Sequence, residues 1–519
     1  MTRRDLLTLF LVGLGVGLAV AAFQSTPGYM DAEYYFATGR RLAEGHGFTE
    51  PFLWNYLDDP AGLPHPSHAY WMPLASLLSA LGMAVTGRLT YAAGRWPFLL
   101  LTASLPPLTA RLAFSLTARR DLAWTSGLLA VFPAFYAPYL PVTDTFSPVM
   151  FLGALFFLVI SLDERPRLRA LTLGLLAGFF HLARADGLIW LLLALGTIWL
   201  ERPGTLRRFP ADKIALVLGG YALVMGAWMA RNLSVFGTVL APGGSRALWM
   251  TRYDELFAYP ANRLTFATWW QAGVNAAVRA RLWALNINAQ TAFAVQGGIV
   301  LFPLILAALR ERRADRRVRL ALLAWGLILT VMTFIFPFAG ARGGFFHSGA
   351  ALQPLWWALA PLGLERFIAW GTRRRGWAEG QARRVFQGGL IALVALLTIV
   401  IAYGRVVGPE PLKPQWDAGE RLYRRVEERL RSLGAPPEVP IVVSNPPGYY
   451  LASGRPAIAL PDGDVETLQA VAARYGARYV LLDPRSTPRG LASLLEDPAT
   501  APGLRYLDTL EEVVLFAIP

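Results

Sequence analysis

The 519-residue chain has no cysteine and only two lysines, and just 16% of its residues are charged. Without cysteine, the protein has no disulfide bond, no thiolate nucleophile and no cysteine-based metal site. Soluble domains average about 25% charged residues, so this low proportion indicates more apolar sequence than one globular core can use. Nucleotide-binding loops and serine-hydrolase elbows are missing too. ATP-driven transport and serine hydrolysis therefore have no support in the sequence.

The sequence contains several long apolar runs. Hydrophobic residues make up 55% of the chain, and its mean hydropathy is +0.40. Runs of about 20 apolar residues predict membrane-spanning helices. We expect an α-helical polytopic membrane protein with about eleven transmembrane helices, near residues 6–23, 93–116, 121–139, 146–162, 169–182, 185–200, 213–231, 291–309, 320–338, 346–365 and 386–404.

The net charge of +14 and the pI near 10.2 first suggest a nucleic-acid partner. The position of the basic residues argues against it, because 23 of them fall in alternate short loops and at the N-terminus. The three short loops on the other side hold only two. Basic loops face the cytoplasm, so we expect a cytoplasmic N-terminus, an extracytoplasmic C-terminus and no nucleic-acid binding. A cleaved signal peptide at 6–23 would also place the next segment outside.

Three regions lie on the predicted outer side. Two are long loops, 24–92 and 232–290, which belong with the helices to a transmembrane domain at 1–405. The stretch Trp71–Val85 is too short to span and predicts an interfacial or re-entrant helix. The third region, 410–519, predicts a small soluble α/β domain. Its elements are expected as helices near 416–433 and 464–475 and strands at Ile441–Ser444, Tyr479–Asp483 and Glu512–Ala517.

Three outer carboxylates are candidates for chemistry. Asp31 and Glu33 follow the first helix closely, where a carboxylate can act as a base on a substrate that arrives in lipid. Asp31 fits equally well as the cap of a helix that begins there. Asp144 is the only charged group in a very short loop, and ionisable residues at that depth are functional candidates.

Cations and histidines lie on the same predicted side. Each of Arg184, Arg231 and Arg342 fits, taken alone, an anchor that reaches the lipid headgroups. Together, beside carboxylates, they suit a lipid-linked phosphate, because guanidinium groups bind phosphate oxygens in pairs. All five histidines are outer: His46, His65, His68, His181 and His347. Zinc at His65 and His68 is a weak hypothesis, and a divalent ion at the three carboxylates stays open.

Five short motifs occur in order along residues 1–405. They are Asp31-Ala-Glu33 before a Tyr-rich helix ending Gly45-His-Gly47, then His65-Pro-Ser-His68, then Asp144, then Ala183-Arg-Ala-Asp-Gly187, and finally Trp228-Met-Ala-Arg-Asn232 with Phe236-Gly-Thr238. In this order they resemble the GT-C superfamily of integral membrane glycosyltransferases, which includes protein O-mannosyltransferases and the aminoarabinose transferases of lipid A. The chain departs from the family pattern in having Asp-x-Glu instead of adjacent Asp-Glu, and Ala185 where a proline is common.

The resemblance implies an inverting glycosyltransferase of the plasma membrane that moves a sugar from a polyprenyl-phosphate donor to a lipid, glycan or protein acceptor. Asp31 would be the general base, and Glu33 and Asp144 would orient the acceptor or hold a metal, although which carboxylate is the base stays open. Apart from that divalent ion, no cofactor is implied. The implied ligands of the donor phosphate are Arg184, Arg231, Arg342 and His347, and the implied substrate-binding residues are Tyr34, Tyr35, His65, His68 and Asp186.

Two other functions would use similar residues. A transporter or flippase for lipid-linked sugars needs polar residues through the middle of the membrane, whereas the predicted spans are nearly free of charge there. A glycan polymerase or ligase would also use polyprenyl-linked sugars. Both stay alternatives to the transferase.

Overall fold

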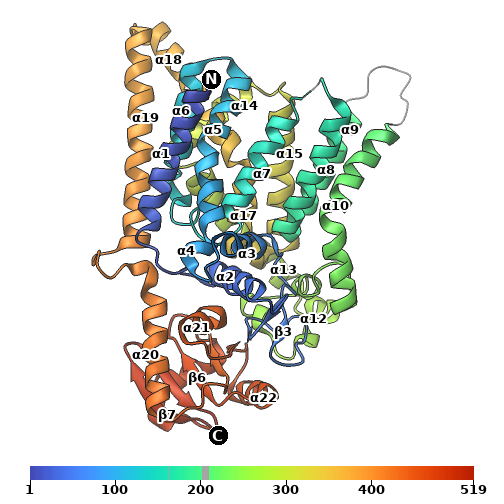
Figure 1. The fold of residues 1–519 in the computed structure, drawn as a ribbon, viewed down its shortest axis with the longest axis vertical. Coiled ribbons are helices and arrows are strands. Elements are labelled where there is room, and N and C mark those ends of the chain that lie inside the picture. The colour runs from blue at the N-terminus through green and yellow to red at the C-terminus, as the bar shows by residue number, and fades with distance from the viewer. Residues whose placement is uncertain (163, 201–209) are drawn as a thin grey trace.

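The computed structural model describes residues 1–162, 164–200 and 210–519, so most of the predicted basic loop at 201–213 lies outside the described residues. The chain is mostly helical, with a bundle of long helices and a sheet beyond one end of it (Figure 1). The long helices are α1 (Arg3–Ala21), α5 (Trp96–Thr117), α6 (Arg120–Val131), α7 (Phe146–Val159), α8 (Pro166–Ala183), α9 (Leu188–Leu200), α10 (Ala211–Phe236), α13 (Val274–Gln290), α14 (Phe302–Glu311), α15 (Arg316–Thr330), α18 (Gln353–Arg375) and α19 (Glu379–Ala402).

Five helical stretches in the described part of the chain are long and apolar enough to cross a membrane. They are Arg3–Ala21, Tyr91–Thr117, Ala211–Phe236, Arg316–Ile335 and Glu379–Val407. Large apolar side chains point outward from them, such as Leu223, which is 75% exposed, and Ile399, which is 62% exposed. Such surfaces suit lipid better than water. The other expected spans coincide with helices that are shorter or more charged, so the number eleven stays a prediction.

Local chemistry sets where these helices begin and end. The Thr2 and Asp5 side chains form a capping box at the start of α1. The expected span 121–139 is shorter in the structure, because α6 stops at Val131 and Pro133 follows. Helices α8 and α10 pack closely through small residues. A Cβ atom on Gly220 would lie 2.6 Å from the Leu171 carbonyl oxygen, so only glycine permits this approach.

The two long loops, 24–92 and 232–290, cover the end of the bundle nearest the sheet; we call them the first and second outer loops after the predicted topology. The first contains α2 (Met30–Ala43), α3 (Leu74–Thr86) and α4 (Tyr91–Gly94), and α2 and α3 lie between the bundle and the sheet (Figure 1). Helix α3 corresponds to the expected short apolar helix, and its Ser76 hydroxyl contacts Thr38 of α2 at 2.7 Å. The second loop contains α11 (Gly243–Ala247) and α12 (Phe266–Gln271) and leads into α13. Short helices α16 (Pro337–Ala339) and α17 (Phe345–Gly349) precede α18.

The C-terminal segment (residues 410–519) forms most of a six-stranded sheet. Its helices are α20 (Ala418–Ser432), α21 (Pro446–Ser453) and α22 (Val465–Tyr475), and its strands are β4 (Ile441–Val443), β5 (Ala457–Ala459), β6 (Tyr479–Leu482), β7 (Arg505–Leu510) and β8 (Val513–Ala517). The strand order is β2-β5-β4-β6-β8-β7. Edge strand β2 (Phe52–Leu53) comes from the first outer loop and pairs in parallel with β5. The sheet therefore joins two distant parts of the chain. In the first outer loop, β1 (Thr49–Glu50) and β3 (His65–Pro66) form a separate antiparallel pair.

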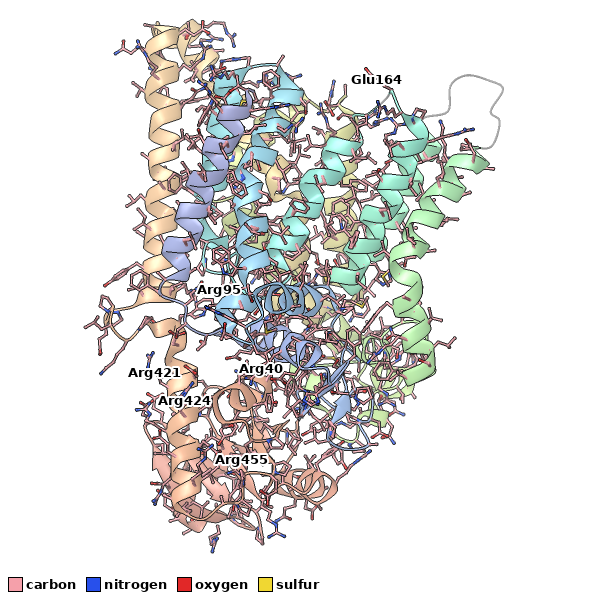
Figure 2. All side chains as sticks on the ribbon, in the orientation of Figure 1. Arg40, Arg95, Glu164, Arg421, Arg424 and Arg455 are labelled. Atoms are coloured by element: carbon pink, nitrogen blue, oxygen red, sulfur yellow. The ribbon has the colours of Figure 1, made fainter. Side chains whose placement is uncertain are left out.

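The two ends of the bundle differ in the segments that connect the helices. The N-terminus, the start of α6 and the turn between α18 and α19 lie at the end away from the sheet (Figure 1). Arg119 and Arg383 both bind Glu365 there, at 2.5 and 3.0 Å. Glu164 marks the same end in Figure 2, whereas Arg40 and Arg95 lie at the opposite end, near the sheet. The basic turns thus gather at one end and the long loops at the other.

Candidate active site

Three ionisable side chains from distant parts of the chain meet where the long loops cover the bundle. Asp31 comes from the first turn of α2, Asp144 from the turn before α7, and His347 from α17. The His347 Nε2 atom lies 3.1 Å from Asp144 Oδ2 and 3.8 Å from Asp31 Oδ2. We call these three residues the acid–histidine cluster. The Asp31 side chain is 32% exposed and the Asp144 side chain 1%, so Asp31 is the more accessible acid.

The His347 ring is fixed by its surroundings. Its Nδ1 atom lies 2.9 Å from the Gly343 carbonyl oxygen, which can only accept a hydrogen bond. The ring also stacks on Phe146, with centroids 4.0 Å apart. With its hydrogen on Nδ1, the ring turns Nε2 toward two carboxylates. A proton on Nε2, or a cation among the three groups, stabilises this arrangement.

The donor set of the cluster fits a divalent metal ion. One ligand atom from each of the three residues lies within 4.8 Å of the other two. Two carboxylate oxygens and an imidazole nitrogen suit first-row divalent ions. In metal sites a histidine ligand commonly donates its other N–H to a backbone carbonyl, as His347 does to Gly343.

The two carboxylates have unlike environments. Burial, followed by the nearby Asp144 carboxylate, raises the pKa of Asp31 to about 6. Burial also acts to raise the pKa of Asp144, but His347 and the hydrogen bonds that Asp144 accepts hold this pKa below its usual value. The Tyr29 hydroxyl donates one of these bonds at 2.5 Å, and the Thr145 backbone N–H donates another. Asp144 is therefore held in place as an anion, while the Asp31 side chain stays partly exposed.

Arginines supply positive charge around the cluster. Arg184, between α8 and α9, pairs with Asp186 at 2.9 Å, and its charge also reaches Asp31. Arg342 lies over the Tyr253 ring, 4.1 Å from the ring centre. Burial raises the pKa of the Tyr253 phenol, Arg342 acts to lower it and Asp31 to raise it, so both charges act on Tyr253.

An open cavity of about 450 Å³ lies beside Arg342. We call it the arginine cavity, because Arg252, Arg279 and Arg342 line it with Tyr253 and Trp283. In the described part of the chain, no carboxylate pairs with Arg279 or Arg342 within 4.0 Å. The cavity thus combines an aromatic wall with guanidinium groups, a surface that suits a phosphate or another anionic group.

Several predicted site residues lie away from the cluster. Glu33 is buried on α2 and accepts a hydrogen bond from the Asn445 side chain at 2.7 Å. Burial raises its pKa to about 7, although the bond from Asn445 acts to lower it. Arg231 donates to the Ser67 carbonyl at 2.9 Å and lies over the Trp228 ring at 4.8 Å. Its guanidinium thus holds the first outer loop against α10.

The two histidines of the His65–His68 motif have separate partners. His65 Nε2 lies 2.9 Å from Asp58. The His68 ring is fully buried and contacts Ser67 at 2.8 Å and Ser76 at 2.9 Å. Each ring is therefore occupied by protein groups, and the structure does not bring the pair together as metal ligands. The buried Tyr34 hydroxyl accepts from the His68 backbone N–H at 2.7 Å, and buried Tyr35 packs against Trp71.

Five residues of the site were not predicted from the sequence: Tyr29, Arg252, Tyr253, Arg279 and Trp283. Tyr29 lies just before the acidic motif, and a tyrosine two residues from a candidate base was a signal to consider. The other four lie in the second outer loop, with Arg279 and Trp283 on α13, and Tyr253 directly precedes the acidic pair Asp254-Glu255. Their role follows from how the second loop folds back over the bundle.

No protein-family model and no curated protein matches the chain, but solved structures do. ArnT from Cupriavidus metallidurans, crystallised with undecaprenyl phosphate, has a TM-score of 0.56 and 14% identity, covering 99% of this chain and 98% of that one. The Archaeoglobus fulgidus oligosaccharyltransferase tethered with an acceptor peptide has a TM-score of 0.53 and 14% identity, covering 100% and 75%. AglB from Archaeoglobus fulgidus, in complex with an inhibitory peptide and a dolichol-phosphate, also has a TM-score of 0.53 and 14% identity, covering 99% and 74%.

All three neighbours are GT-C proteins. The chain therefore has the GT-C fold, and the family resemblance predicted from the motifs is confirmed at the level of the fold. The match with ArnT extends over nearly the whole of both chains. At 14% identity, this likeness describes the fold alone.

Proposed function

We propose that this protein is a membrane-embedded glycosyltransferase that moves a sugar from a polyprenyl-phosphate donor to a lipid, glycan or protein acceptor. The observation that carries the proposal is the acid–histidine cluster, with its partly exposed Asp31, near the arginine cavity. The GT-C fold supports it, since the neighbours named above are glycosyltransferases, one bound to undecaprenyl phosphate and one to a dolichol-phosphate. In such a donor the bond to phosphate already activates the sugar, so the reaction needs no nucleotide. This agrees with the missing nucleotide-binding motif.

The transfer step follows from the residues. An acceptor hydroxyl oxygen forms a bond to the anomeric carbon, and the bond from that carbon to the phosphate oxygen breaks with inversion. The hydroxyl proton passes to Asp31, and polyprenyl phosphate leaves with the bonding electrons. Arg184, Arg279 and Arg342 attract the charge that grows on this phosphate. Asp144 and His347 orient Asp31. Arg231 has no part in this step, because it binds the first outer loop.

A divalent ion at the cluster is compatible with this assignment. Asp31, Asp144 and His347 would hold it, and when bound it would act as a Lewis acid that makes the acceptor hydroxyl more acidic. The cluster positions the acceptor with or without the ion, because its hydrogen bonds to Tyr29, Thr145 and Gly343 come from the protein itself.

We further propose the topology in which this site faces outward from the plasma membrane. The basic turns at one end of the bundle would face the cytoplasm with the N-terminus. The two long loops and an α/β domain formed by the C-terminal segment would lie outside, and eleven helices would cross the bilayer. Donor headgroup and acceptor would then meet between the bundle and the C-terminal segment.

The decisive experiment incubates the purified protein with a panel of polyprenyl-phosphate sugars and measures free polyprenyl phosphate by mass spectrometry. We expect one donor to be consumed, by transfer or by slow hydrolysis, and its identity names the sugar. A transporter or flippase would release no polyprenyl phosphate from any donor, and a polymerase would produce chains of repeated units. Either result would contradict the proposed transferase.

A further inference from the structure

The C-terminal segment contacts the first turn of α2, directly behind Asp31. The Asn445 side chain donates to Glu33 at 2.7 Å and accepts from the Gly448 backbone N–H at 3.3 Å, capping α21. The fit around Glu33 is tight, since a Cβ atom on Gly448 would lie 2.6 Å from Glu33 Oε2. Glu33 itself is only 6% exposed. Its carboxylate is thus enclosed by the cap of a helix that belongs to the C-terminal segment.

Helix geometry connects this contact to the candidate base. Two residues correspond to roughly 200° around a helix axis, so Asp31 and Glu33 project from nearly opposite faces of α2. Asp31 points to the acid–histidine cluster and Glu33 to the C-terminal segment. One turn of helix moves as a unit, so the position of Glu33 sets the position of Asp31.

A second contact fixes the wall of the arginine cavity. Asp462, which follows β5 in the C-terminal segment, accepts hydrogen bonds from Arg252 and Arg263, both at 2.9 Å. Asp462 is only 4% exposed, and its backbone N–H also donates to the Phe257 carbonyl at 3.0 Å. Arg252 lines the cavity, and the next residue, Tyr253, supports Arg342. This contact therefore holds the second outer loop in the position in which Arg252 and Tyr253 line the cavity.

We propose that the C-terminal segment positions the two halves of the site through separate contacts: Asn445 and Glu33 set the base, Asp31, and Asp462 sets the anion-binding wall through Arg252. The inference rests on the proposed transferase activity. It makes Glu33, Asn445 and Asp462 positioning residues. It also predicts two different kinetic signatures, since displacing a base lowers kcat whereas loosening a binding wall raises KM.

The first contact is tested with substitutions around Glu33. Gly448→Ala should lower kcat by about 10- to 100-fold and leave the KM for the donor unchanged, because a displacement near 1 Å can cost about 100-fold. Glu33→Ala should lower kcat similarly. Glu33→Gln still accepts the bond from Asn445, so it should restore most of the turnover lost in Glu33→Ala. The matched control is Gly419→Ala, where a Cβ atom meets nothing within 4 Å, and it should behave like the parent protein.

The second contact is tested with Asp462→Asn, which should raise the donor KM by about tenfold while kcat stays within twofold, the shift expected from about 1.4 kcal/mol of lost binding. Parental kcat in Gly448→Ala, or equal losses in Glu33→Ala and Glu33→Gln, would overturn the role of Glu33. If Gly448→Ala does not fold, the comparison of Glu33→Ala with Glu33→Gln tests the role of Glu33 without it. A lower kcat with parental KM in Asp462→Asn would overturn the role of Asp462. If the parent protein consumes no donor, it is the proposed function that fails.

Discussion

Replacing Asp31 by Asn tests the role of the candidate base apart from the roles of Asp144 and His347. The substitution keeps the size and the polarity of the side chain but removes the proton acceptor. A positioned general base contributes about 10²–10⁴-fold in rate, or about 3–5 kcal/mol of the barrier. Asp144 cannot replace it, since Asp144 is 1% exposed and already bound by Tyr29 and His347. We therefore expect Asp31→Asn to lower kcat at least 100-fold.

The assay is release of polyprenyl phosphate from the donor found in the panel, measured with the protein in detergent. Expression level and melting temperature should match those of the parent protein. Glu44→Gln is the control, since this acid lies at the other end of α2 and forms an ion pair with Arg40 at 2.7 Å that is partly open to solvent. Asp31→Asn with more than a third of the parental turnover would refute the assignment. Loss in Asp144→Asn alone would move the base to Asp144.

Three other predictions concern the metal, the topology and the first outer loop. Chelation with EDTA should lower turnover and added Mn²⁺ or Mg²⁺ should restore it; unchanged turnover would remove the ion from the mechanism but leave the base in place. Because the chain lacks cysteine, Ala61→Cys and Ala314→Cys can be labelled singly, and only Ala61→Cys should react with a membrane-impermeant thiol reagent in intact cells; labelling of Ala314→Cys would invert the topology. Burial acts to lower the pKa of His65, but its ion pairs with Asp58 and Glu50 outweigh burial and raise this pKa to about 9. The charge therefore stabilises the fold by about 3 kcal/mol below pH 6.5, and this stabilisation is lost as the pH rises toward 9. His65→Gln should flatten that part of a melting-temperature profile, and an unchanged slope would contradict it.

Hydropathy predicted the long helices well because apolar length needs no tertiary information. The first and last helices of the bundle, α1 and α19, lie close to the predicted spans 6–23 and 386–404. Prediction was weaker where the backbone is irregular. The expected span 291–309 begins instead with a π-helical turn, and α14 starts only at Phe302. Such breaks depend on how neighbouring helices satisfy the freed backbone groups, which no local pattern reveals.

In the candidate site, too, some features could be predicted from the sequence and others depend on tertiary contacts. Sidedness alone predicted that Asp31, Asp144 and His347 lie at one end of the protein, and the structure brings them into contact. Closeness in sequence suggested that Glu33 shares this site, but helical periodicity places it on the other face of α2, and this could have been read from the spacing. Its partner Asn445 lies 412 residues away, and that pairing had no signal in the sequence.

The two-residue strand β2 has a consequence for how the protein is made. Its partner, β5, is synthesised some 400 residues later, after every helix of the bundle. The edge of the sheet beside β5 stays incomplete until β5 has been made, so the first outer loop has to wait, with its apolar residues Phe52 and Leu53 unpaired. Pairing over such a separation is slow, so this loop is the part of the nascent chain most open to proteases and chaperones. Pairing of β2 with β5 is therefore a late step of assembly, and a chain cut before β5 would leave that loop without its partner strand.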